Sequence, residues 1–261
     1  MIATLDFKSK FLDYYTQVSV ILPKRPDSSM PADYYQRDKR YRVLWLLHGA
    51  NCDHTMWIRR SNIETYARSR DLIVVMPSIG NTNYSKWSVP DTGLDSHRYF
   101  TEELMPLVWN WLPASSARED NFVCGFSMGG CGAIKLAALH PDLFGGVAAL
   151  SGTPVDLRLK TDDPDVVWWQ NLADQAAGSH EAALAGEDNV WDLLPQVKDE
   201  LPPLYASCGT EDSLYEGVYL AFKDYAQKLG MNATFSETPG LAHDWDFWDP
   251  ELPRVMDFFG L

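Results

Sequence analysis

Short apolar runs alternate along the chain with longer stretches in which apolar residues recur every three or four positions. The runs are rich in aliphatic and β-branched residues, as buried strands are. They cover residues 17–22, 42–47, 72–76, 121–125, 146–151, 203–208 and 232–237. Such strands, separated by helices, indicate an α/β fold with a mostly parallel central sheet and helices on both faces. The earliest strands have no helix between them, so we expect the sheet to start antiparallel.

Two of the intervening stretches predict helices with one apolar face. In residues 98–112 the predicted face consists of Phe100, Leu104, Leu107, Val108 and Trp111. In residues 214–230 it consists of Leu214, Val218, Phe222, Tyr225 and Leu229. Gly230 follows the second face and is a stop signal, because glycine readily adopts the left-handed conformation that ends many helices.

Residues 153–201 interrupt this alternation. They separate two predicted strands by nearly fifty residues, more than a crossover usually needs. Two short helical patterns lie within them, at 162–175 and 189–196. We expect residues 1–261 to form one domain in which 153–201 is a cap-like insertion over the carboxyl-terminal edge of the sheet. An ordinary two-helix crossover is the alternative.

Acidic residues outnumber basic ones in this chain of 261 residues, 36 to 22, and the net charge is −14. That balance argues against a nucleic-acid partner, which requires a concentrated basic face. The amino-terminal stretch lacks a basic region followed by an apolar one, and no apolar run approaches the roughly 20 residues that span a bilayer. We therefore expect a cytoplasmic protein with no membrane partner.

Ser127 lies in the glycine-rich stretch NFVCGFSMGGCG, between a predicted strand and a predicted helix. So abrupt a turn forces its central residue to a positive φ angle. Residues two positions away on either side must then be small, and Gly125 and Gly129 meet that requirement. The start of the helix adds free N–H groups and the positive end of its dipole. The pattern predicts a nucleophilic serine, while a turn that only packs helix against strand is the alternative.

A serine hydroxyl needs a base, and the base needs an acid that orients it. In this arrangement both follow later strands, in the order Ser, Asp or Glu, His. Of the six histidines, only His243 follows a strand downstream of the other candidates, which makes it the predicted base. Asp212, after the strand at 203–208, is the best-placed acid. Glu211 beside it and Asp156 after an earlier strand stay open.

An oxyanion intermediate also needs N–H donors. One predicted donor is the amide of Met128, directly after the candidate nucleophile. The second is predicted at Ala50, because Gly49 permits a sharp turn where the strand at 42–47 ends. A plain turn at the end of that strand is the alternative.

Ten tryptophans point to an aromatic pocket. Those near predicted strand ends or in the insertion are Trp57, Trp87, Trp168, Trp169 and Trp245. The predicted substrate-binding residues among them are Trp57, Trp87 and Trp245, and core packing is the alternative for each. No metal or other cofactor is expected, because the acidic stretch HDWDFWD offers a single histidine without a partner ligand.

Five motifs, in their order and spacing, resemble the esterase D-like branch of the α/β-hydrolases. They are LLHGANCDHTMWIRR, MPSIGNTNYSKW, GFSMGGCGAIKLAALHPDLFGGVAALSG, CGTEDSLY and GLAHDWDFWD. The chain looks most like bacterial tributyrin and acetyl esterases, with feruloyl esterases and S-formylglutathione hydrolases as relatives. The resemblance begins near Leu12 and fades in 153–201, where substrate specificity is expected to reside.

The resemblance implies an α/β-hydrolase fold and a serine carboxylesterase that works through an acyl-enzyme. It implies Ser127 as nucleophile, His243 as base, Asp212 as acid, and Ala50 and Met128 as oxyanion donors. The expected substrates are small acetyl or butyryl esters of neutral alcohols or sugars. It also allows association into homo-oligomers.

Three alternatives to this function stay open. Feruloyl or cinnamoyl esters are one alternative substrate class. S-formylglutathione ranks lower, because HGANC matches the HGLTC-type loop of that branch only in part. The non-enzyme alternative is an inactive hydrolase fold that serves as a binding module.

Overall fold

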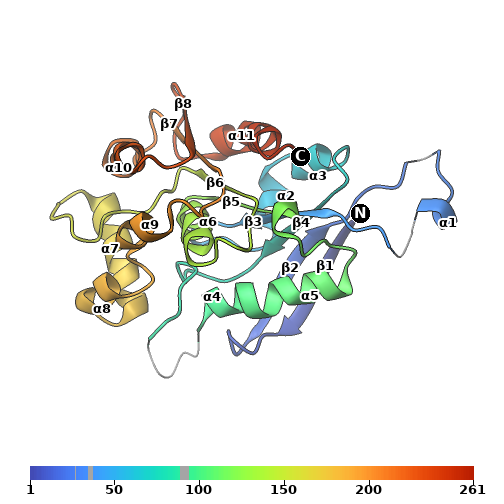
Figure 1. Ribbon diagram of the computed structural model, residues 1–261, viewed down its shortest axis with the longest axis horizontal. Coiled ribbons are helices and arrows are strands. Elements are labelled where there is room, and N and C mark those ends of the chain that lie inside the picture. Colours follow the sequence, from blue (N-terminus) through green and yellow to red (C-terminus); the bar gives the residue numbers. More distant parts are fainter. Residues whose placement is uncertain (27, 35–37, 89–93) are drawn as a thin grey trace.

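An eight-stranded sheet forms the centre of the computed structural model, which describes residues 1–26, 28–34, 38–88 and 94–261 (Figure 1). The strands are β1 (Ile2–Lys8), β2 (Tyr15–Ile21), β3 (Arg42–Leu47), β4 (Leu72–Pro77), β5 (Asn121–Phe126), β6 (Gly146–Leu150), β7 (Leu204–Gly209) and β8 (Ala233–Thr238). Their order across the sheet is β1-β2-β4-β3-β5-β6-β7-β8. β2 pairs antiparallel with both β1 and β4, and every other pair is parallel, as predicted.

The seven predicted strands are confirmed as β2 to β8, with boundaries within two residues. The sequence pattern does not predict β1. Its residues alternate between exposed and half-buried, so they form no continuous apolar run of the kind that marks the central strands. β1 is an edge strand that pairs on one side only.

Eleven α-helices lie within the described residues: α1 (Pro31–Tyr34), α2 (Met56–Arg60), α3 (Ile63–Ala67), α4 (Ser96–Arg98), α5 (Met105–Trp111), α6 (Met128–Leu139), α7 (Pro164–Ala177), α8 (His180–Ala185), α9 (Val190–Val197), α10 (Ala221–Leu229) and α11 (Trp245–Phe258). α5, α6 and α10 cover one face of the sheet, where Val43 and Trp45 of β3 are buried. α2, α3 and α11 cover the other, where Leu44 and Leu46 are buried. Successive side chains of a strand point to opposite faces, so β3 is apolar along its whole length.

A π-helical turn accounts for one error in the predicted helical faces. Trp111 is 80 % exposed, although the pattern placed it on the buried face of its helix. Residues Tyr99–Leu104 form a π-helix before α5, and its wider turn shifts the register of the residues that follow. Met105 is therefore buried instead. A second π-helix, Tyr215–Leu220, precedes α10, which ends as predicted at Gly230 with φ +68°.

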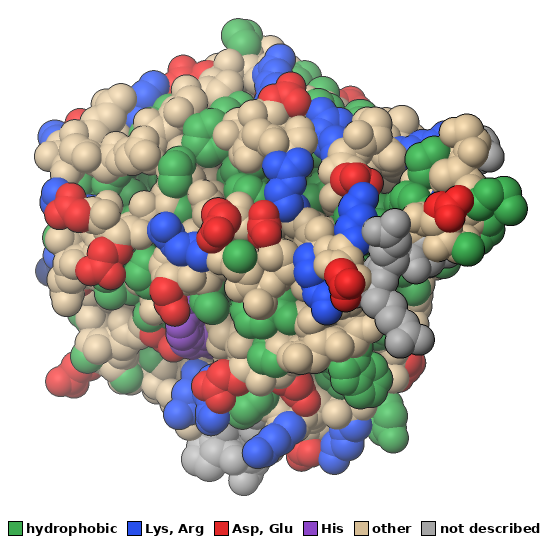
Figure 2. Space-filling model, turned by 45° about the vertical axis from the view of Figure 1, so that its right-hand side comes forward, with side chains coloured by type: hydrophobic (Ala, Val, Ile, Leu, Met, Phe, Trp, Pro, Cys, Tyr) green, Lys and Arg blue, Asp and Glu red, His purple; other side chains and the backbone are tan. Residues whose placement is uncertain are grey.

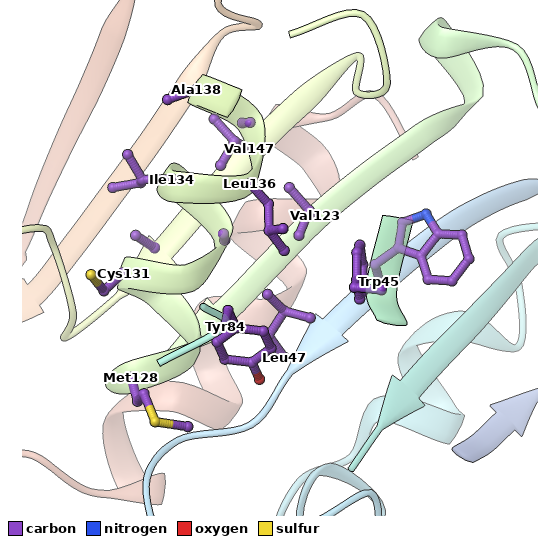
Figure 3. Packing of buried hydrophobic residues seen from close by; sticks show 14 of the residues in the cluster. Trp45, Leu47, Tyr84, Val123, Met128, Cys131, Ile134, Leu136, Ala138 and Val147 are labelled. Carbon is purple, nitrogen blue, oxygen red and sulfur yellow. The ribbon is translucent and has the colours of Figure 1, made fainter. Parts of the chain in front are cut away.

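α6 runs from the candidate nucleophile across the central strands. Figure 3 shows Ile134, Leu136 and Ala138 of α6 beside Val123 of β5 and Val147 of β6. Every residue of α6 up to Ala138 is buried, so this helix is covered on its outer side as well as by the sheet. The outer cover includes α9, which packs against α6.

A buried ion pair joins α6 to the segment 153–201. Nζ of Lys135, only 1 % exposed, donates to Oδ1 of Asp188 at 2.7 Å, just before α9. Nδ2 of Asn83 and Oγ of Ser85 donate to the same oxygen at 3.0 and 2.6 Å. Buried charges are tolerated when paired and hydrogen-bonded in this way. The helical patterns predicted in this segment are confirmed as α7 and α9, and α8 lies between them.

Charged side chains of both signs are interspersed with apolar ones on the face of the molecule that Figure 2 shows. Exposed large apolar side chains, such as Tyr15 and Met30, are of the scattered kind that is normal on protein surfaces. Within the described ranges, no helix is both long and apolar enough to cross a membrane.

Candidate active site

Ser127 forms the turn between β5 and α6 and has φ +52°, the positive angle that the sequence predicts. Its amide donates to the carbonyl of Leu150 at 2.8 Å, and its carbonyl accepts from the amide of Gly130 at 2.9 Å. A Cβ on Gly125 would lie 2.3 Å from the backbone of Gly129. Only glycine allows the two arms of the turn to approach so closely, and the serine is therefore held at its tip.

Gly152, after β6, supports the same turn from the neighbouring strand. A Cβ on it would lie 1.9 Å from the carbonyl oxygen of Ser127. Gly152→Ala is therefore expected to lower the free energy of unfolding by about 3 kcal/mol, because rigid backbone must move. Urea denaturation measures this. Gly217→Ala is the control: its Cβ would meet Oδ2 at the end of the Asp163 side chain rather than backbone, and a smaller loss of about 1 kcal/mol is expected. Equal stability of the two variants would contradict this packing.

Asp212 and His243 meet at the carboxyl-terminal edge of the sheet, after β7 and β8. Nδ1 of His243 lies 2.9 Å from Oδ2 and 3.1 Å from Oδ1 of Asp212. The amide of Leu214 donates to Oδ1 of Asp212 at 2.9 Å. The carboxylate is buried, whereas 31 % of the His243 side chain is exposed. The acid thus fixes one ring nitrogen of a histidine whose other nitrogen is left for chemistry.

The surroundings keep Asp212 ionised. Burial raises the pKa of its carboxyl group, but hydrogen bonding to His243, the charge of His243 and hydrogen bonding to Ser151 outweigh burial, so the pKa lies below its usual value. Nε1 of Trp248 donates to Oγ of Ser151 at 3.0 Å. The Trp248 ring also stands edge-on to the His243 ring, with centroids 4.9 Å apart. One tryptophan therefore supports both members of the pair.

The other two candidate acids have different surroundings. Asp156 pairs with Arg158, whose Nε lies 2.8 Å from its Oδ1. The side chain of Glu211 is exposed. Among the three carboxylates, Asp212 is the one that the structure places on His243.

A pocket of about 240 Å³ brings three of the candidate residues together: Ala50, Ser127 and His243. Its lining consists of Ala50, Ser127, Asp165, Trp168, Trp169, Ser213, Leu214 and His243, and we call it the Ser127 pocket. The lining residues follow β3, β5, β7 and β8 or belong to α7. Ligand sites of open α/β sheets form at this edge, outside the carboxyl ends of the strands.

The two predicted oxyanion donors lie at this edge as well. Met128 is the first residue of α6, and Ala50 lines the Ser127 pocket. In the part of the chain that the structure describes, no acceptor takes a hydrogen bond from either amide. His48 braces the loop before Ala50: its Nε2 accepts from the amide of Ile79 at 3.1 Å, which leaves its Nδ1 to donate to the carbonyl of Gly49 at 2.7 Å. Burial lowers the pKa of His48, so the ring is neutral, as these bonds require.

The predicted tryptophans lie outside the lining of the Ser127 pocket. The prediction that Trp57 contacts substrate is wrong: Trp57 is fully buried, and its Nε1 donates to the carbonyl of Leu47 at 3.1 Å. Trp245 packs edge-on against Trp57, with ring centroids 5.2 Å apart. Nε1 of Trp87 donates to the carbonyl of Thr82 at 2.9 Å. The rings of these three tryptophans pack in or against the hydrophobic core, which was the alternative stated for each of them.

The tryptophans that do line the pocket come from α7. The residues of α7 that are buried are Val166, Trp169, Leu172, Ala173 and Ala176. Trp168 falls off this helical face and is 42 % exposed. Trp168 is therefore the sequence signal for this wall of the pocket, because it is a large aromatic residue on the polar side of an amphipathic helix. No such signal marks Asp165, since an acid in the first turn of a helix is ordinary.

A serine on a tight strand-to-helix turn, beside an Asp–His pair on later strands of a mostly parallel sheet, is the arrangement of the α/β-hydrolase fold. Comparison with known proteins agrees with that class. A family described as "Putative esterase" matches residues 17–258. The acetyl esterase of Caldicellulosiruptor saccharolyticus is 26 % identical over 98 % of this chain and 97 % of its own.

Two solved structures from Staphylococcus aureus are similar over almost the whole chain. The fluorophosphonate-binding serine hydrolase FphF has a TM-score of 0.83 and 27 % identity, and the alignment covers 99 % of this chain and 98 % of FphF. The S-formylglutathione hydrolase FrmB has a TM-score of 0.80, 27 % identity and the same coverage. The chain belongs to the esterase family whose pattern it matches, and it is a serine carboxylic-ester hydrolase with the α/β-hydrolase fold.

Proposed function

We propose that the protein hydrolyses short-chain acyl esters, acetyl or butyryl esters of neutral alcohols or sugars, with Ser127 as nucleophile. The observation that carries the proposal is the bonding of the buried Asp212 to Nδ1 of His243, while His243 and Ser127 line one pocket. A hydroxyl, an imidazole and an orienting carboxylate are the three groups that serine hydrolysis requires.

The proposed reaction has two halves. Oγ of Ser127 attacks the ester carbonyl while Nε2 of His243 takes its proton. The C–O bond to the alcohol then breaks, and His243 returns the proton to the leaving oxygen. In the second half, water gives a proton to His243 and attacks the acyl-enzyme. The bond between the acyl carbon and Oγ then breaks, His243 returns the proton to Oγ, and the carboxylic acid is released. Asp212 stabilises the imidazolium throughout.

The amides of Ala50 and Met128 are the proposed oxyanion donors. Both lack an acceptor among the described residues, and one begins a helix, whose dipole favours negative charge at that end. Donors fixed before the reaction stabilise the tetrahedral intermediate without reorganisation, and one such donor contributes about 3 kcal/mol. His48, which braces the loop of Ala50, acts through that loop.

The residues of 153–201 are proposed as a cap-like insertion in one domain. The support is that α7 supplies Asp165, Trp168 and Trp169 to the Ser127 pocket. A cytoplasmic location and homo-oligomer formation stay predictions.

A substrate panel tests the proposal. The kcat/KM for 4-nitrophenyl acetate and butyrate is expected to exceed that for the octanoate by at least about tenfold, because a pocket of about 240 Å³ leaves a long acyl chain in water. Methyl ferulate and S-formylglutathione belong in the same panel, since FrmB favours S-formylglutathione as the second candidate. If S-formylglutathione were hydrolysed orders of magnitude faster than the acetate, the second candidate would replace the first.

A further inference from the structure

The Ser127 pocket has a negatively charged wall. Of its eight lining residues, Asp165 is the one with a carboxylate side chain, and neither Lys nor Arg is among them. The chain as a whole is acidic, but this charge lies inside the site rather than on the far surface. A charge within a partly enclosed pocket acts on a bound ligand with less screening than an exposed one.

Among the residues that the structure describes, none engages the carboxylate of Asp165. Asp165 is the second residue of α7, and its amide donates to Oδ1 of Asp163 at 3.0 Å, the contact that caps the helix. In the described ranges, no ion pair or hydrogen bond reaches the Asp165 carboxylate, and the residue is half-buried. By contrast, Asp156 is paired with Arg158. Asp165 is therefore free to interact with whatever occupies the pocket.

The remainder of this wall is aromatic. Trp168 is 42 % exposed, and its ring stands edge-on to that of Trp169 at 5.0 Å between centroids. A flat apolar ring beside a carboxylate suits an alcohol that offers a C–H face for stacking and hydroxyl groups for hydrogen bonding. It opposes an alcohol that carries a negative charge, since two like charges in one pocket repel.

We infer that Asp165 selects substrates by charge and restricts the enzyme to esters whose alcohol portion bears no negative charge. This inference rests on the proposed function, in which the alcohol portion is the larger part of the ester bound beside Ser127 and α7. It makes Asp165 a specificity-determining residue that neither the family match nor the motifs assign. It also favours esters of uncharged alcohols that bear hydroxyl groups over thioesters of peptides that carry free carboxylates.

Three phenyl acetates that differ in charge test the inference: 3-acetoxybenzoate, phenyl acetate and 3-acetoxy-N,N,N-trimethylanilinium. The kcat/KM of each is measured for the wild type and Asp165→Asn. For each protein, the kcat/KM of the charged probe is divided by that of the neutral probe. The ratio for the variant is then divided by the ratio for the wild type, which cancels differences in leaving-group reactivity. We expect the anionic-to-neutral ratio to rise about tenfold in Asp165→Asn and the cationic-to-neutral ratio to fall by a similar factor, as for unit charges roughly 6 Å apart in a partly wet pocket.

Asp246→Asn is the matched control. Asp246 is the second residue of α11, as Asp165 is of α7, and it is exposed and absent from the lining of the Ser127 pocket. The control therefore reproduces the loss of one charge and of one favourable helix-dipole contact. Its ratios are expected to stay within twofold of the wild type, and the Asp165→Asn effect is expected to shrink at high ionic strength.

Two results would overturn the inference alone. One is an anionic-to-neutral ratio that Asp165→Asn leaves unchanged. The other is an equal shift in Asp246→Asn, which would assign the effect to net charge. If the wild type did not hydrolyse phenyl acetate, or hydrolysed it without needing Ser127, the proposed function would be overturned, and the inference with it.

Discussion

Ser127→Ala is expected to lower kcat for 4-nitrophenyl acetate by about 10⁵- to 10⁶-fold and to leave the fold intact. The hydroxyl is the proposed nucleophile, so no acyl-enzyme can form without it. Alanine is no larger than serine and meets the same backbone demand at φ +52°. The residual rate reflects the oxyanion donors and substrate binding.

The measurement combines steady-state kinetics with mass spectrometry after a fluorophosphonate reagent. The wild type should gain one covalent adduct on Ser127, and the variant should gain none. Ser69→Ala, an exposed serine outside the pocket, should match the wild type in both. A Ser127→Ala protein that kept a tenth of the wild-type rate would show that another group is the nucleophile. If the protein were a binding module, this substitution would leave its function intact.

Asp212→Asn is expected to reduce kcat by about 10⁴-fold. The carboxylate accepts from Nδ1 of His243 at 2.9 Å and thereby selects the tautomer whose Nε2 can take a proton. An asparagine amide could instead donate to Nδ1 and stabilise the wrong tautomer. A loss of this size corresponds to about 5.5 kcal/mol of transition-state stabilisation.

The chain supplies its own controls for this change. Glu211→Gln and Asp156→Asn remove the other two candidate acids, one adjacent in sequence and one paired with Arg158. Both are expected to keep kcat within about threefold of the wild type. A larger loss in either variant than in Asp212→Asn would move the role of the acid to that residue. Circular dichroism of all three proteins shows whether a loss reflects unfolding.

The residues at the site that can be predicted from the sequence are those whose position depends on local backbone or on chain order. The turn at Ser127 needs glycines at fixed distances, so the requirement is visible in five residues. Asp212 and His243 follow two strands whose parallel pairing places their carboxyl ends together. Sequence alone left Glu211 open as the acid, since adjacent residues differ only in the direction of the side chain.

The pocket wall could not be predicted in the same way, because it depends on packing between distant segments. Trp57 and Trp168 look alike in the sequence, but one lies fully buried under the sheet and the other is 42 % exposed. The difference comes from which face of each helix meets the core. The sequence also failed to predict β1, because this edge strand is half-exposed and only alternate residues face the protein.

The residues proposed for bond-breaking and the residues proposed for substrate choice stand on separate stretches of the chain. The first follow strands of the central sheet, whereas Asp165, Trp168 and Trp169 share one helix. Exchanging the first turns of α7 is therefore a compact route to re-engineered esterases: a graft of a few residues would retune which alcohols are accepted while the reactive centre keeps its geometry.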